Sequence, residues 1–346
     1  MRRIGVTLAV LALYRIASWV PLPGVDISSL LSPEAVHTTA VPRVSMVALG
    51  VVPMLSALIL IEMAMIAFPR LRAWAGEHAE RRAEIDGWAL VLALAIAGFQ
   101  ANGVAVALEE IHVLVAEPGL VFRAGVIASL VGGSAFLLWL GSLITRHGVG
   151  NGLWVLIAVP YANSFTEALV AQHALWGPAS FVSIALSVGF LGLCAGVLAA
   201  LLKSSPARAQ TEELPWAPIL GFAAANWVLI VPLLVLWLLG ADTQNVDINT
   251  LLTSQVALLL PVVTIPLLVL LRRRSFATPA AAPASAVPLA LAFGALVAAG
   301  TALAYLPAQP LFPLPAPTLV LAAIGLVVVD GLVNERRGTE TAPTVS

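Results

Sequence analysis

Apolar segments of near-membrane length recur along the whole chain, and short polar stretches separate them. An apolar run of about 20 residues can cross the hydrocarbon core of a bilayer as an α-helix. The pattern therefore predicts an all-α membrane protein with ten transmembrane helices. The ten segments comprise residues 4–20, 44–69, 87–108, 120–144, 152–170, 179–202, 215–240, 251–271, 286–306 and 316–333.

The fifth segment is less apolar than the others. Residues 153–162 are strongly apolar, but Asn163, Thr166, Glu167 and Gln172 follow them. Polar side chains are costly against lipid, so we expect this helix to face a water-filled or protein interior.

Composition supports a membrane protein. Hydrophobic residues make up 60% of the 346 residues and charged residues only 10%, whereas soluble domains carry about 25% charged residues. The mean hydropathy is +1.00. The first apolar run follows Arg2 and Arg3, as in a signal peptide. It lacks a small-residue cleavage site and leads into further apolar runs, so we expect it to be retained as a span.

The basic residues lie mostly in alternate loops. With the N-terminus in the cytoplasm, 14 of the 17 basic residues fall on cytoplasmic segments. Because cytoplasmic loops are enriched in Lys and Arg, this distribution predicts that both termini are cytoplasmic. The 14 residues are Arg2, Arg3, Arg70, Arg72, Arg81, Arg82, Arg146, Lys203, Arg208, Arg272, Arg273, Arg274, Arg336 and Arg337.

Ten spans can form two halves of five spans, and an odd number of spans per half inverts the second half. We expect an N-terminal half over residues 1–170, a C-terminal half over residues 171–338 and a short cytoplasmic tail over residues 339–346. No residue-level repeat links the halves, so topology alone suggests the symmetry.

Four polar residues inside the apolar segments are candidate functional residues, because polar and ionisable groups within a bilayer are expensive. Glu62 could carry a coupling proton in a transporter, or its side chain could reach the membrane interface. We expect Arg15 to snorkel or to form an ion pair, and Asp330 to pair with the arginines that follow it. Asn226 either lines a cavity or accompanies a bend in its helix.

Other chemistries find little support. Cys194 is the only cysteine, and the five histidines lack the spacing of metal ligands. We therefore expect no enzyme activity, no metal site and no cofactor. The alternate glycines of TRHGVGNG, residues 145–152, lack the Lys-Ser/Thr ending and the preceding strand of a phosphate loop. They predict a tight cytoplasmic turn, with Arg146 as a positively charged anchor.

This turn also carries a resemblance to a known family. Residues 132–158, GGSAFLLWLGSLITRHGVGNGLWVLIA, resemble the most recognisable segment of SecY, the channel subunit of the bacterial protein translocase. Segments 14–26, 44–60, 76–103 and 319–338 resemble further parts of the family in the same order. The matching positions in the first segment are Phe136, Leu137, Trp139, Leu140, Gly141, Ile144, Thr145, Gly148, Gly150, Asn151 and Gly152.

The resemblance implies a SecY-like protein-conducting channel of two inverted five-helix halves, with a lateral gate between spans two/three and seven/eight. It implies a pore ring of aliphatic side chains that offers ions no hydrogen bonds yet deforms around a threading polypeptide. Carried over by alignment, the ring positions are Val51, Leu55, Ile157, Ala224 and Ile324.

The resemblance also implies partners and a location. The partners would be small SecE-like and SecG-like membrane subunits, the translocating polypeptide, the lipid bilayer, and either the motor ATPase SecA or a ribosome. The location would be the bacterial cytoplasmic (inner) membrane.

The sequence also departs from the family's pattern. The stretch that forms a plug helix in the family is here only Ile27 to Arg43, and the docking loops after the sixth and eighth segments are short. Glu62 stands where the family usually has Gln. These departures favour a divergent, specialised paralogue. The alternatives are a proton-coupled permease that uses Glu62 and a non-conducting structural SecY paralogue.

Overall fold

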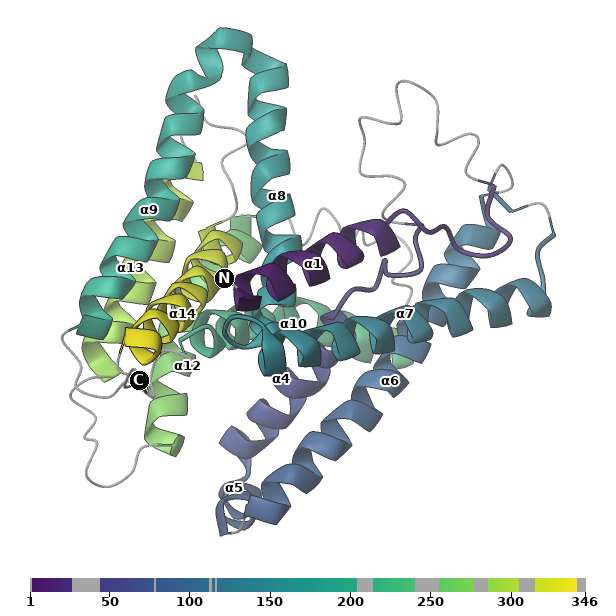
Figure 1. Cartoon of the computed structure of the whole chain (residues 1–346), viewed down its shortest axis with the longest axis horizontal. Coiled ribbons are helices and arrows are strands. Elements are labelled where there is room, and N and C mark those ends of the chain that lie inside the picture. The colour runs from purple at the N-terminus through teal and green to yellow at the C-terminus, as the bar shows by residue number, and fades with distance from the viewer. Residues whose placement is uncertain are drawn as a thin grey trace, which may run out of the picture. The chain divides into compact units, whose positions relative to one another are not determined.

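The computed structural model describes residues 2–26, 44–77, 79–111, 114–115, 117–203, 214–239, 255–276, 286–304 and 315–340. Within these ranges the regular elements are eleven α-helices and one 3-10 helix, beside two isolated β-bridges. Each of the ten predicted apolar segments contains a helix (Figure 1). The predicted plug stretch and most of both predicted docking loops lie outside the described residues.

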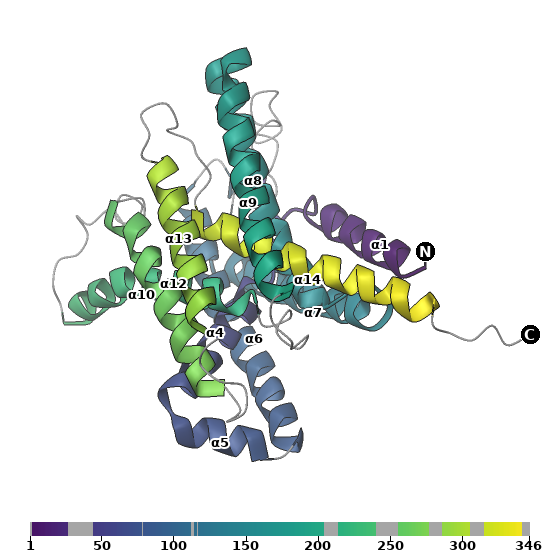
Figure 2. The same cartoon turned by 90° about the vertical axis from the view of Figure 1, so that its left-hand side faces the viewer.

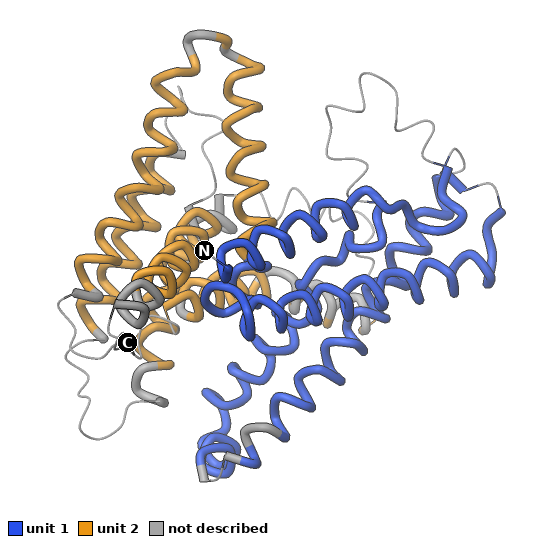
Figure 3. The backbone as a smooth tube through the Cα atoms, viewed as in Figure 1, with its two compact units in different colours: residues 1–157 blue, residues 158–346 orange. Residues whose placement is uncertain are grey.

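The chain divides into two compact units, residues 1–157 and 158–346 (Figure 3). The division falls inside one helix, and the predicted halves, which meet at residue 170, remain a prediction. Unit 1 contains α1 (Arg2–Ala17), α4 (Val52–Ala67), α5 (Pro69–Glu77), α6 (Ala79–Glu109), α7 (Leu120–His147) and the start of α8 (Gly152–Trp176). Unit 2 contains the rest of α8, η2 (Gly177–Ser180), α9 (Phe181–Lys203), α10 (Trp216–Leu238), α12 (Gln255–Phe276), α13 (Ala286–Ala304) and α14 (Pro315–Glu340).

Several helices are long and apolar enough to cross a membrane. Among the described residues, four reach that length: Glu84–Glu109, Leu120–His147, Gly152–Leu175 and Phe181–Leu201. A fifth candidate is the pair of α4 and α5, which is bent by 107°. The chain is therefore a multi-pass membrane protein, and the number of ten spans remains a prediction.

In unit 1, α6 packs against α4 and α7. Alanines recur at every fourth position of α6, and each is at most 2% exposed. Residues four apart share one face of a helix, so this alanine stripe gives α6 a smooth surface that neighbouring helices can approach closely. The alanine stripe consists of Ala89, Ala93, Ala97, Ala101 and Ala105.

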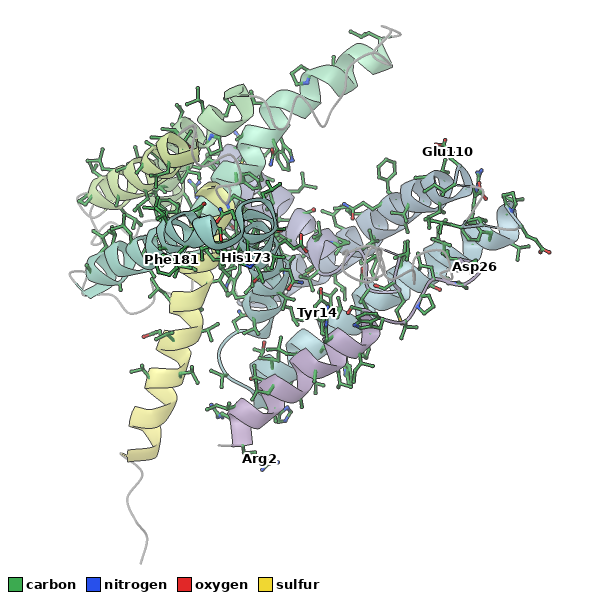
Figure 4. All side chains as sticks on the ribbon, turned by 90° about the horizontal axis from the view of Figure 1, so that it is seen from above. Arg2, Tyr14, Asp26, Glu110, His173 and Phe181 are labelled. Carbon is green, nitrogen blue, oxygen red and sulfur yellow. The ribbon has the colours of Figure 1, made fainter. Side chains whose placement is uncertain are left out.

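One end of unit 1 is closed by short backbone pairings and an ion pair. The Leu22 amide donates to the Val44 carbonyl at 2.9 Å. Glu109, at the end of α6, accepts from Arg123 Nε at 2.7 Å and from the Gly119 amide at 2.8 Å. Asp26 and Glu110 lie together at this end, away from Arg2 (Figure 4).

Unit 2 is held by close packing of α10, α12 and α13, which are neighbours in Figure 2. A side chain at Gly221 would overlap Ile265 of α12, and Thr264 Oγ1 donates to the Gly221 carbonyl at 2.7 Å. A Cβ at Gly294 of α13 would lie 2.8 Å from Pro266 Cγ of α12. The surrounding core includes Phe190, Cys194, Leu198, Ile265, Val269, Phe293, Leu319 and Ala323.

Candidate functional site

The signature turn, residues 145–152, reverses the chain between α7 and α8. The Gly148 amide donates to the Ile144 carbonyl at 2.7 Å and ends α7. Gly150 has a φ of +67°, a left-handed conformation that favours glycine. Asn151 Oδ1 accepts from the Leu153 amide at 3.0 Å and so caps the start of α8. These residues build a tight reversal.

Thr145 ties the two arms of the turn together. Its hydroxyl donates to the Gly141 carbonyl at 3.1 Å and accepts from the Gly152 amide at 2.9 Å. Any side chain at position 152 would overlap the Gly141 carbonyl, so the backbones of α7 and α8 touch here. The glycines thus permit close packing as well as the reversal.

Thr7 of α1 docks the turn onto the N-terminal helix. The Val149 amide donates to Thr7 Oγ1 at 3.0 Å, and Thr7 in turn donates to the Arg3 carbonyl at 3.2 Å. A Cβ at Gly148 would lie only 2.7 Å from Thr7 Oγ1. Sequence reasoning missed Thr7, because one threonine in an apolar helix gives no sign of a partner 142 positions later.

Arg146, the predicted anchor, has an exposed side chain in the last turn of α7. A positive charge is favourable at a helix C-terminus, where the backbone carbonyls carry partial negative charge. Its local role is therefore electrostatic, and its role as a cytoplasmic anchor stays a prediction.

The candidate ring residues of unit 1 are buried aliphatic side chains. Val51 is the N-cap of α4, and the Leu55 amide donates to its carbonyl at 3.0 Å, so Val51 and Leu55 lie one turn apart on one face. Ile157, in α8, is 1% exposed. Each of the three is less than a tenth exposed.

The other two candidate ring residues belong to unit 2. Ile324 of α14 is fully buried, and Ala224 of α10 is half-buried. Helices α10 and α14 are in contact within this unit. The ring as a whole, which needs residues from both units, stays a prediction.

The predicted intramembrane polar residues occupy different environments. Glu62 is buried within unit 1 at 6% exposure. The Arg15 side chain is exposed, and its guanidinium carbon lies 5.6 Å from the Trp19 ring centroid. Asn226 and Asp330 are half-buried in unit 2. The structure does not describe the side chains of Arg336 and Arg337, which are predicted to pair with Asp330.

The half-polar fifth segment mixes exposed and buried side chains. Asn163, Thr166 and Glu167 are exposed. Gln172 is buried and its amide donates to Ser187 Oγ of α9 at 3.2 Å. Sequence reasoning missed three buried serines, Ser180 of η2 and Ser183 and Ser187 of α9, whose helical spacing was the available signal.

A pocket of about 510 Å³ in unit 1 is lined by residues of α4, α6, α7 and α8. Beside it, a narrow gap with no room for a water molecule lies between α4, α6 and α7. Val51 and Ser134 line this gap. Ser134 is 3% exposed, and its hydroxyl has no hydrogen-bond partner among the described residues. A buried hydroxyl without a partner among the described residues therefore lies beside Val51.

Metal chemistry has no visible site in the part of the chain that the structure describes. No group of three or more His, Cys, Asp or Glu side chains is placed there to hold an ion.

Comparison with known proteins identifies the family. The sequence model of SecY matches residues 45–249, which contain the signature turn and the candidate ring residues of unit 1. The chain belongs to the SecY family. It is 28% identical over 215 residues to the protein translocase subunit SecY of Rickettsia conorii, covering 57% of this chain and 50% of that protein. It is 33% identical over 171 residues to the protein translocase subunit SecY of Escherichia coli K12, covering 45% and 39%.

Solved structures resemble this chain in fold over its whole length. Sec61 in the canine ribosome-channel complex from the endoplasmic reticulum matches with a TM-score of 0.57 and 14% identity, covering 100% of this chain and 94% of that one. A structure described as that of a protein conducting channel matches with a TM-score of 0.56, at the same identity and coverage. The sequence matches, in contrast, span half or less of the curated relatives' length.

Proposed function

We propose that the chain is a protein-conducting channel subunit that moves secretory polypeptides across a membrane or inserts them into it. The family match over residues 45–249 carries the proposal, because this range contains Val51, Leu55 and Ile157. The short loops and Glu62 set the chain apart from the family pattern, so we assign it as a divergent, specialised member.

The proposed gate is a collar of aliphatic side chains. Val51, Leu55 and Ile157 would contribute from the first half, and Ala224 and Ile324 from the second. Aliphatic groups cannot replace the hydration of an ion, so a narrow collar blocks ions by expelling water. The same side chains can shift between rotamers around a threading polypeptide. Val51, Leu55 and Ile157 are buried aliphatic side chains, the type of side chain that the proposed collar requires.

The proposed topology has ten spans in two inverted halves, residues 1–170 and 171–338, with a cytoplasmic tail at 339–346. Both termini would face the cytoplasm, and the membrane would be the bacterial inner membrane. The distribution of basic residues and the bacterial relatives support this arrangement. The lateral gate would lie between spans two/three and seven/eight.

The proposed partners are small SecE-like and SecG-like membrane subunits and the translocating polypeptide. A channel of this kind is passive, so SecA or a ribosome would supply the driving force. Co-purification from the native membrane tests these partners directly, because a bound small subunit or motor would be identified by mass spectrometry.

Cross-linking of a stalled secretory chain tests the channel. Photoreactive groups at Val51, Leu55 and Ile157, introduced as single cysteines after Cys194→Ala, should form adducts with the stalled chain. The exposed neighbours Val52 and Leu60 on α4 are matched controls that should not. A correctly inserted protein with no adduct at the three ring positions would overturn the channel and favour the non-conducting paralogue.

A proton-coupled permease is the second candidate, because Glu62 is a buried carboxylate within an apolar helix. Glu62→Gln separates the two functions. A proton-coupled carrier should lose transport, whereas a polypeptide channel should keep its cross-linking pattern and its translocation.

A further inference from the structure

Helix α5 lies across the end of a membrane helix. Pro69 disfavours a helical conformation at the residue before it, and Phe68 is accordingly extended, with φ −115° and ψ 93°. The axes of α4 and α5 differ by 107° at this point. Figure 2 shows α5 running across the ends of α4 and α6. If α4 crosses the bilayer, α5 therefore runs along its surface.

Two arginine side chains, one from α5 and one from α6, hold α5 in this orientation. Arg72 donates to the Met65 carbonyl at 3.3 Å, which satisfies one of the carbonyls that the end of α4 leaves open. Arg81 of α6 donates to the Trp74 carbonyl at 3.4 Å, and its guanidinium carbon lies 5.3 Å from the Trp74 ring centroid. The bend is thus braced from α4 and from α6.

The braced helix exposes apolar and aromatic groups. Phe68 is 63% exposed, Leu71 37% and Trp74 36%, whereas Ala75 is buried. Phe68 stands at the very end of the apolar α4, which is the depth of the membrane interface. Trp and Tyr are enriched at that depth, because their rings are apolar but carry one polar group that can reach water, and Trp74 fits this pattern.

Charge in this region is positive. Residues 69–82 contain four arginines, at positions 70, 72, 81 and 82, against two glutamates, Glu77 and Glu80. Arg70 is exposed. Arginine clusters beside a membrane helix attract anionic lipid headgroups on the cytoplasmic leaflet.

We propose that α5 is an interfacial helix that binds anionic phospholipid of the cytoplasmic leaflet. Phe68 and Leu71 insert among the acyl chains just below the headgroups, Trp74 lies at the headgroup level beside Arg81, and Arg70 pairs with a lipid phosphate. The inference uses the cytoplasmic orientation of this loop but not the pore, so it stands whether or not the channel conducts. A lipid fits better than a soluble polypeptide, because the exposed rings lie at the end of an apolar span.

Depth and lipid preference can be measured together. The full chain, with Cys194→Ser and Leu71→Cys, carries a fluorescent nitrobenzoxadiazole label on α5 and is reconstituted into nanodiscs of two parts phosphatidylcholine to one part phosphatidylglycerol. Either lipid is then supplied spin-labelled near its headgroup, at equal density. We expect spin-labelled phosphatidylglycerol to quench the label more strongly than spin-labelled phosphatidylcholine.

Arg70→Gln should lower the local enrichment of phosphatidylglycerol by up to about fivefold, and added salt should do the same. Arg2→Gln, which removes an exposed arginine from the end of α1, is the matched control and should leave the enrichment unchanged. Equal quenching by both lipids, or an equal loss in the two variants, would overturn the anionic-lipid site. A label that neither lipid quenches would place α5 in water, available to a soluble partner, and would also overturn it.

Discussion

The Cα of Gly152 stands against the carbonyl oxygen of Gly141, so closely that no side chain fits at position 152. The contact joins the last turns of α7 to the first turn of α8, and the Thr145 hydroxyl bridges the same two residues. Gly141 and Gly152 are therefore packing residues, and they bring two apolar helices to backbone contact.

Gly152→Ala should separate α7 from α8. The added methyl group must displace the Gly141 carbonyl, and overpacking of this kind costs about 1–3 kcal/mol. We expect a lower unfolding midpoint in detergent, measured by intrinsic fluorescence. Gly132→Ala is the control, because nothing lies within 4 Å of that position and alanine favours a helix interior over glycine. A Gly152→Ala protein as stable as the control would refute the packing role.

Thr7→Val should release the turn from α1. The buried Val149 amide would lose its acceptor, and an unsatisfied buried amide costs about 1–3 kcal/mol. Faster hydrogen exchange at the Val149 amide and a lower unfolding midpoint would report the loss. Thr7→Ser keeps the hydroxyl and should restore both.

The hydrophobic pattern was sufficient to locate one helix in each of the ten apolar segments. Burial of apolar side chains needs no specific partner, so each predicted apolar segment contains a helix. The ends of the helices were harder to predict than their positions. The second predicted segment starts at residue 44, but residues 44–51 are not helical, and α4 begins where Pro53 can occupy the first turn.

Specific contacts could not be predicted from the sequence. Thr7 and Val149 meet only because the fold brings them together, and α5 was missed because nine mixed residues have no clear period. The candidate ring came from family resemblance, since buried Val51 or Ile157 does not differ in sequence from any other apolar residue.

Ser134→Ala should stabilise unit 1. The Ser134 hydroxyl is buried without a partner among the described residues, and removal of such a group recovers about 1–3 kcal/mol of desolvation cost. A higher unfolding midpoint is expected. Ser187→Ala should have the opposite effect, because Ser187 accepts from Gln172 at 3.2 Å and donates to the Ser183 carbonyl at 2.9 Å. Destabilisation by both variants would show that Ser134 is satisfied in the protein.

Gly221→Ala should loosen α10 from α12. A methyl group at position 221 would overlap Ile265, at a cost of about 1–3 kcal/mol. Limited proteolysis and thermal unfolding would detect the change in unit 2. Gly325→Ala in α14 adds the same methyl group in open space and should be neutral. If the two variants behave alike, α10 and α12 are not held by this contact.

The alanine stripe of α6 determines how the membrane helices of unit 1 keep their longitudinal register. The methyl groups at every fourth position are too small to interdigitate with the side chains of a neighbouring helix. This face of α6 therefore does not fix the longitudinal position of that helix. Register must come from contacts that tolerate no displacement, and on α7 these are Gly133 against the Met46 carbonyl and Gly141 against Gly152. These two glycine contacts of α7 therefore fix the longitudinal positions of the helices, which the alanine stripe of α6 leaves undefined. The height of the candidate gate in the membrane depends on them.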